Sequence, residues 1–214
     1  MSGPMAARPP QRVVLAGHYA RLEPLGPQHS GDLYRAATGK EQRFIYLFEA
    51  APASKAAMDD WVARACAKDD PLSFAVIDRA SGRAEGRQSL MRITPEHGVI
   101  EVGGIYWGPA IARTRVTTEA LFLHARYVFD ELGYRRFEWK CNDLNEPSKA
   151  AARRFSFTFE GVFRQHMIVK GHNRDTAWFS MLDSEWPGIK AEFARWLDPG
   201  NFDLDGAQRT KLRF

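Results

Sequence analysis

The segment at residues 113–118 holds the residue types best suited to binding an anion. It reads Arg-Thr-Arg-Val-Thr-Thr, follows a strand-like stretch and a Gly-Pro turn, and begins a long helical pattern. The start of a helix presents free backbone N–H groups and the positive end of the helix dipole, which suit a phosphate or pyrophosphate. Capping by threonine and solvation of arginine explain the same residues. On spacing alone, this ordinary structural interpretation is the favoured one.

The sequence patterns of several other kinds of site are absent. There is no GxSxG, GxxxxGK[ST], GxGxxG or HExxH motif. The six histidines are scattered without ligand spacing, and the two cysteines, Cys66 and Cys141, are far apart. These absences argue against a hydrolase, a dinucleotide-dependent enzyme, a metal site and a disulfide scaffold.

Length and composition predict one large globular domain without a membrane span. The chain has 214 residues, of which 44% are hydrophobic and 26% charged, and it has no run of eighteen apolar residues. The net charge of +4 comes without any block of five like charges, so a nucleic-acid partner is not indicated. Residues 1–11 contain three prolines and no apolar stretch typical of a signal peptide, so we expect a disordered arm and a cytoplasmic protein.

Hydrophobic periodicity predicts an α/β (α+β) domain over residues 12–198, followed by a tail at 199–214 with no predicted fold. The antiparallel strands lie in one sheet with helices between and after them. The predicted strands are 12–25, 73–78, 88–94, 99–107, 136–141, 162–169 and 176–182, and the predicted helices are 27–38, 54–68, 114–132, 145–155 and 185–197.

Several of these segments, taken in order, resemble the GNAT acetyltransferases. Gly104-Ile105-Tyr106-Trp107, then Pro109, then Arg-Val-Thr-Thr-Glu-Ala-Leu at 115–121 resemble the family's acetyl-CoA-binding motif. Asn-Glu-Pro-Ser at 145–148 is similar to the family's Asn-x-x-Ser. The similarity spans residues 12–183 and is closest to the branch that includes the ribosomal-protein N-acetyltransferases. It implies the GNAT fold, a mixed and mostly antiparallel central sheet flanked by helices, with splayed central strands.

The resemblance implies acetyl-CoA as cosubstrate, no metal, and a specific set of binding residues. The backbone N–H groups near Ile105 and Tyr106 would face the thioester carbonyl beside Trp107. Asn145 would bind the pantetheine arm or a bridging water rather than only cap a helix. The phosphates would lie at Arg113, Thr114, Arg115, Thr117 and Thr118.

One part of the phosphate-binding loop departs from the family pattern. Ala112, Arg115 and Thr117 stand where the family usually has Gln or Arg, Gly, and Gly or Ala. Glycines there let the backbone approach the phosphates closely. The replacements either add a guanidinium and a hydroxyl to the phosphate contacts or weaken CoA binding.

The resemblance implies two proton carriers. The family often has a glutamate two residues before the strand glycine, which with Gly103 makes Glu101 the expected general base and leaves Glu138 as the alternative. Glu101 could equally be a solvated strand carboxylate. Ser148 resembles the general acid used in this branch, and it could also cap the following helix.

The expected function is transfer of an acetyl group to a primary amine, either a protein N-terminus or a small molecule. The alternative is a GNAT-fold module that binds CoA, or nothing, without chemistry. No nucleic acid or membrane partner is expected, and a homodimer is compatible with the sequence. We expect the acceptor to lie between residues 44–48 and the hairpin residues Gln165, His166, Lys170, His172 and Arg174.

Overall fold

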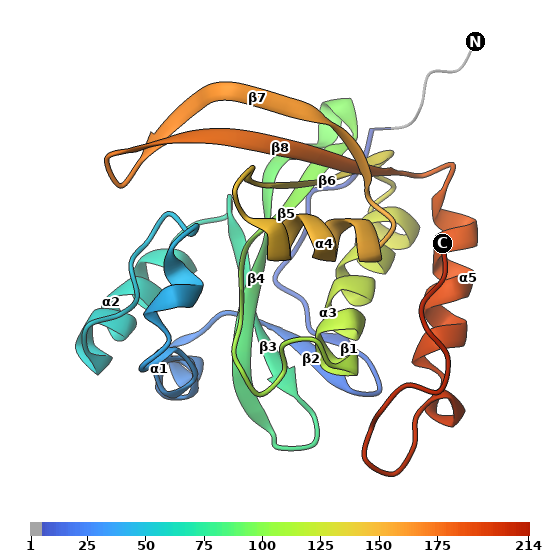
Figure 1. Cartoon of the computed structure of the whole chain (residues 1–214), viewed down its shortest axis with the longest axis horizontal. Helices are drawn as coiled ribbons and strands as arrows, with labels where there is room; N and C mark the ends of the chain where they lie inside the picture. The colour runs from blue at the N-terminus through green and yellow to red at the C-terminus, as the bar shows by residue number, and fades with distance from the viewer. Residues whose placement is uncertain (1–5) are drawn as a thin grey trace.

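The computed structural model describes residues 6–214, which form one eight-stranded sheet with helices on both faces (Figure 1). The strand order is β1-β2-β3-β4-β5-β6-β8-β7, and every neighbouring pair is antiparallel except β5 and β6. The strands are β1 (Leu15–Ala16), β2 (Ala20–Pro24), β3 (Leu72–Asp78), β4 (Arg83–Thr94), β5 (Val99–Trp107), β6 (Arg136–Asn142), β7 (Thr158–Val169) and β8 (His172–Leu182).

Five α-helices flank the sheet, close to the predicted positions. They are α1 (Ser30–Ala37), α2 (Lys55–Cys66), α3 (Arg115–Arg126), α4 (Glu146–Arg154) and α5 (Trp186–Leu197). The predicted helix 114–132 ends its α-helical part at Arg126 and continues as a π-helical turn over Tyr127–Glu131. The helices therefore lie close to the positions that the sequence predicts, around a mixed and mostly antiparallel sheet.

Alternation of side chains along the strands gives the sheet two separate cores. In β3, Phe74 and Val76 belong to the core shared with α3 and α5, whereas Ala75 and Ile77 belong to the core shared with α1 and α2. This is the two-residue period of a strand that is buried on both faces. Helices α1 and α2 lie at the left of Figure 1 and α5 at the right, and the β7–β8 hairpin crosses the top.

The two central strands, β5 and β6, are hydrogen-bonded to each other along only part of their length. The parallel ladder of β5 and β6 ends at the pair Val102–Trp139, although both strands continue beyond it. Between Gly103 and Tyr106, β5 advances three residues while β4 advances two, and Gly104 has a φ of +58°. This is a β-bulge at the paired glycines Gly103 and Gly104. It bends β5 away from β6 and opens the sheet.

Both predicted terminal segments differ from expectation. The arm was expected to be disordered over 1–11; its first five residues lie outside the described part, but Ala7 is buried and the Arg8 N–H donates to the Leu132 carbonyl. In the tail, Phe202 is 7% exposed and forms an isolated β-bridge with Gln208. The tail therefore packs against the domain, because its aromatic residue finds an apolar site there.

Candidate active site

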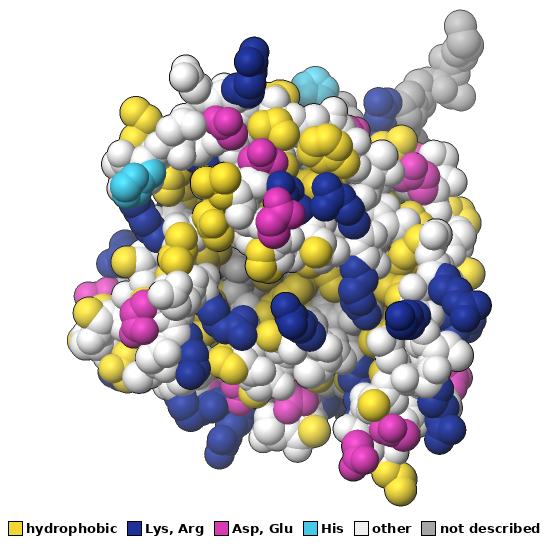
Figure 2. Space-filling model, viewed as in Figure 1, with side chains coloured by type: hydrophobic (Ala, Val, Ile, Leu, Met, Phe, Trp, Pro, Cys, Tyr) yellow, Lys and Arg dark blue, Asp and Glu magenta, His cyan; other side chains and the backbone are white. Residues whose placement is uncertain are grey.

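A cavity of about 1580 Å³ runs through the opening between β5 and β6. Its walls come from both sheet faces: the strand ends, the starts of α3 and α4, the loop at 42–49 and the tail. Nine lysine and arginine residues line it, against two glutamates. Figure 2 shows a hollow near the centre of this face, with Lys and Arg side chains gathered around it. A cavity whose wall carries this excess of positive charge suits an anionic ligand.

The start of α3 forms one end of the cavity, called here the cofactor end. Thr114 caps the helix, since its Oγ1 accepts a hydrogen bond from the Val116 N–H at 3.2 Å. Within residues 6–214, the N–H groups of Arg113, Arg115 and Thr117 donate no hydrogen bond. All three residues line the cavity. These free donors at a helix N-terminus fit the pyrophosphate of CoA.

The residues that replace the family's glycines do not block this helix start. Arg115 and Thr117 lie within the helix and neither has a positive φ, so no glycine is required at these positions. The Arg115 guanidinium lies between two aromatic rings, with its Cζ 4.4 Å from the Tyr19 ring centroid and 5.1 Å from that of Phe202. The tail thus holds this side chain against the domain.

Tyr19 is itself held by the Thr-Glu-Ala-Leu part of the motif. The buried carboxylate of Glu119 accepts hydrogen bonds from the N–H groups of His18, Tyr19 and Ala20 at 2.7, 2.5 and 2.6 Å. Three charge-assisted bonds to backbone fix the turn before β2 to α3. The glutamate of the motif therefore has a structural role here.

The two predicted threonines differ in their access to the cavity. Both hydroxyls donate back to the Thr114 carbonyl, at 3.1 Å for Thr117 and 3.3 Å for Thr118, and Thr118 does not line the cavity. The prediction that Thr118 contacts the phosphates is therefore not supported by its placement. Its hydroxyl accepts a hydrogen bond from Arg154 Nη1 at 3.0 Å, and Arg154 does line the cavity. The sequence interpretation missed Arg154.

The middle of the cavity holds the predicted general acid. Ser148 Oγ accepts a hydrogen bond from Trp139 Nε1 at 3.0 Å and lies beside Cys141, whose thiol pKa is raised by burial. Asn145 Oδ1 accepts from the Ser148 N–H at 3.2 Å, so Asn145 caps α4. This is the role the sequence interpretation ranked second. Both Asn145 and Ser148 line the cavity.

The three predicted residues at the end of β5 have different surroundings. Gly104 and Ile105 lie in the bulge without a partner residue on β4, and the β6 ladder has already ended. The Tyr106 ring stacks on Phe44 at 4.7 Å and its hydroxyl donates to the Ala36 carbonyl, so that side chain is structural. Trp107 Nε1 donates to Gln88 Oε1 at 3.1 Å.

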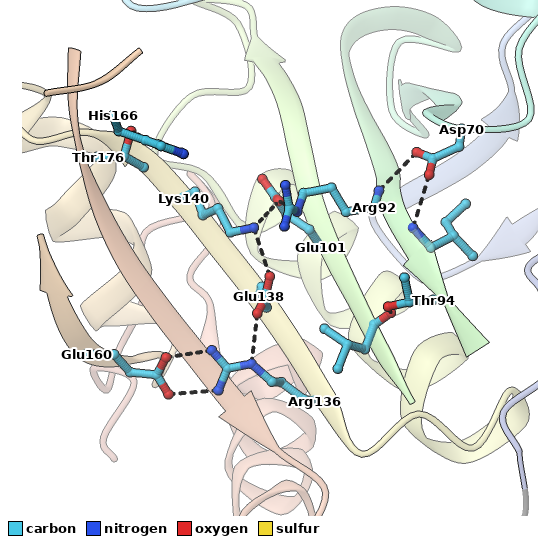
Figure 3. Close-up of polar contacts among 12 residues, drawn as sticks. Asp70, Arg92, Thr94, Glu101, Arg136, Glu138, Lys140, Glu160, His166 and Thr176 are labelled. Carbon is cyan, nitrogen blue, oxygen red and sulfur yellow. Dashed lines mark hydrogen bonds and ion pairs between the residues drawn. The ribbon is translucent and has the colours of Figure 1, made fainter. Parts of the chain in front are cut away.

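Glu101 lies at the other end of the cavity, called here the acceptor end, within a chain of charged side chains (Figure 3). Lys140 Nζ lies 2.8 Å from Glu101 Oε2 and 2.9 Å from Glu138 Oε2. Arg136 continues the chain, with its Nε 2.8 Å from Glu138 Oε1 and its Nη1 2.7 Å from Glu160 Oε1. Alternate residues of β6 supply Arg136, Glu138 and Lys140 because they share one sheet face.

The two candidate bases have pKa values displaced in opposite directions. Burial raises the pKa of Glu101 above its ordinary value, although Lys140 opposes the change. Burial also acts on Glu138, but hydrogen bonds from Lys140 and Arg136 hold its pKa below the ordinary value. Only Glu101 lines the cavity. The structure therefore favours Glu101 over Glu138 as a proton acceptor.

Fewer of the predicted acceptor residues line the acceptor end than the sequence analysis expected. Tyr46, Leu47 and Phe48 line the cavity, whereas Phe44 packs inside the domain. Of the hairpin residues, only Arg174 lines it; Gln165, His166, Lys170 and His172 do not. The sequence interpretation missed Arg87 and Lys140, which are the other two buried cations of this wall.

Comparison with known proteins identifies the class. The family model described as "Acetyltransferase (GNAT) domain" matches residues 20–158. The chain therefore belongs to the GNAT acetyltransferase family.

Three similar proteins are each named as N-acetyltransferases. A crystal structure of a GCN5-related N-acetyltransferase from Brucella melitensis is 54% identical, with a TM-score of 0.97, covering 99% of this chain and 97% of that one. The uncharacterized N-acetyltransferase p20 of Bacillus licheniformis is 29% identical over 54% of this chain and 64% of its own length. YdaF of Bacillus subtilis (strain 168), provisionally named a ribosomal N-acetyltransferase, is 30% identical over 49% of this chain and 57% of its own length.

Neither a membrane-spanning helix nor a metal-binding cluster occurs among the described residues. None of the helices within 6–214 is both long and apolar enough to cross a membrane. The same residues contain no group of three or more His, Cys, Asp or Glu side chains that could hold a metal ion.

Proposed function

We propose that this protein is an acetyl-CoA-dependent N-acetyltransferase that transfers the acetyl group directly to a primary amine. The observation that carries the proposal is the cavity through the β5–β6 opening, which joins free helix N–H donors to a buried glutamate. A direct transfer needs both at one gap, since donor and acceptor must meet there. A small-molecule amine and a protein N-terminus are both candidate acceptors; the cytoplasmic location and a homodimer stay predictions.

Each proposed step belongs to a residue at the gap. Bound acetyl-CoA supplies the thioester. Glu101 takes the proton from the ammonium group, directly or through water, because burial raises its pKa toward that of a useful base. The N–H groups of Ile105, in the bulge, and Tyr106, next to it, would face the thioester carbonyl and would stabilise its developing negative charge. Ser148, oriented by Trp139, returns a proton to the leaving thiolate.

The competing function is a CoA-binding module without chemistry, which the altered loop at Ala112, Arg115 and Thr117 favours. The side chain of Arg115 is drawn aside by Tyr19 and Phe202, which leaves the helix N–H groups free and speaks for retained binding.

Two measurements separate these functions. Thermal shift with acetyl-CoA reports binding, and thiol release with a panel of amines reports transfer. We expect stabilisation together with amine-dependent release. Stabilisation without release from any amine supports the CoA-binding module. No stabilisation at millimolar acetyl-CoA refutes the enzyme and leaves a GNAT-fold module that binds no CoA.

A further inference from the structure

Three cations on the cavity wall are buried, and only one lacks an anionic partner. Arg87 pairs with Glu49, and Lys140 pairs with Glu101 and Glu138. Arg174 is 7% exposed and forms no ion pair with any residue of 6–214. Because desolvating a cation costs free energy unless an anion repays it, Arg174 is anomalous.

The contacts that Arg174 does make leave its charged fork free. Its Nε donates to Thr176 Oγ1 at 3.3 Å, and its Cζ lies 4.9 Å from the ring centroid of Phe48. Neither terminal nitrogen has a hydrogen-bond partner in 6–214, and neither is among the buried unpaired atoms, so both keep some exposed surface. They are therefore available to a ligand in the cavity.

The position of Arg174 places it at the acceptor end. Thr176 pairs with Asn142, the last residue of β6, so Arg174 lies just past the point where β6 stops. Phe48 comes from the loop before α2, on the sheet face of Glu101 and Lys140. The free N–H groups of α3, by contrast, lie at the cofactor end.

The geometry points to Arg174 as the carboxylate-recognising residue of the acceptor site, so that the acceptor carries a carboxylate near its reactive amine. This inference rests on the proposed function. A guanidinium offers two parallel donors that match the two oxygens of a carboxylate. Phe48 covers the pair from one side and lowers its exposure to water, which strengthens the charged hydrogen bonds.

Acceptors that differ in one carboxylate test the inference, with rates compared for the same protonation state of the reacting amine. One arm compares a free amino acid with its C-terminal amide, and the other compares seryl-glutamate amide with seryl-glutamine amide. The first arm reports an α-carboxylate and the second a side-chain carboxylate. We expect kcat/KM to be at least about tenfold higher for the charged member of one pair, as for a charge-assisted hydrogen bond.

The Arg174→Met variant should lose about 10- to 100-fold in kcat/KM on the charged member. Its activity on the uncharged member and its KM for acetyl-CoA should stay unchanged, and Arg174→Lys should restore part of the loss. Arg164→Met is the matched control, because Arg164 is an exposed arginine of β7 outside the cavity. Circular dichroism checks that each variant folds; if Arg174→Met does not, Arg174→Gln replaces it.

Three results would overturn the inference: no charge preference in the wild type, equal loss on both members, or a raised KM for acetyl-CoA. Failure of the proposed function is separate, since no amine would then be acetylated at all. In that case thermal shift decides. Stabilisation by the charged compounds that disappears in Arg174→Met supports carboxylate binding, and no such stabilisation refutes it.

Discussion

The cofactor end and the acceptor end of the cavity hold their positive charge in different ways. At the cofactor end, Arg115 and Arg154 lie against aromatic rings and form no ion pair within the described chain. At the acceptor end, the buried cations Arg87 and Lys140 are paired with glutamates, and among the buried cations described there only Arg174 has no such partner. The first arrangement suits a polyanion of fixed structure. In the second arrangement, Glu101 is left to act as the proposed base and Arg174 is left to bind the proposed acceptor carboxylate.

The two ends of the cavity also differ in how far the sequence alone could predict them. The cofactor end is built mainly from one continuous segment, 104–121, so its residue order predicted the Gly-Pro turn and the capped helix start. The acceptor end gathers residues from β4, β6, β8 and the loop at 42–49, and their meeting depends on tertiary packing. Local patterns carry no information about such a meeting.

Three features that the sequence interpretation ranked second or did not predict have specific physical causes. Thr118 lies one helical position past the cavity wall, and its hydroxyl is used by its own helix and by Arg154. Asn145 caps α4, since an unpaired helix N–H takes the nearest side-chain acceptor. The tail gave no periodic signal, because Phe202 packs as a single aromatic residue against Tyr19 and Trp196 rather than as part of an element.

The largest expected effect is that of Glu101→Gln, at the acceptor end. Removing the base should lower kcat by about 10²- to 10⁴-fold, with the KM for acetyl-CoA unchanged, as measured by thiol release. Unchanged kcat would show that Glu101 is only part of the charge network around Lys140.

The pH profile sharpens the same prediction. Activity needs ionised Glu101, so kcat/KM should fall as pH drops through the pKa of this group. Because burial raises that pKa above the ordinary 4.5, the fall should begin at higher pH than for an exposed glutamate. An acceptor amine as basic as a lysine side chain stays protonated throughout this acid limb, so its own titration lies at higher pH. The wild-type acid limb should be missing in Glu101→Gln.

A smaller effect, of opposite kind, is expected from Arg154→Gln at the cofactor end. Loss of one charged contact to a phosphate should raise the KM for acetyl-CoA about tenfold and leave kcat at saturation unchanged. Arg153→Gln is the control, because Arg153 neighbours it on α4 but does not line the cavity. A loss in kcat rather than KM would contradict the division between the two ends.

The most direct test is a crystal structure of this protein with CoA bound. The phosphates should lie at the N–H groups of Arg113, Arg115 and Thr117, within reach of Arg154. The pantetheine arm should pass between the β5 bulge and β6, with its sulfur near Ser148 and facing Glu101. CoA bound elsewhere, or an arm that does not enter the β5–β6 opening, would contradict the proposed site.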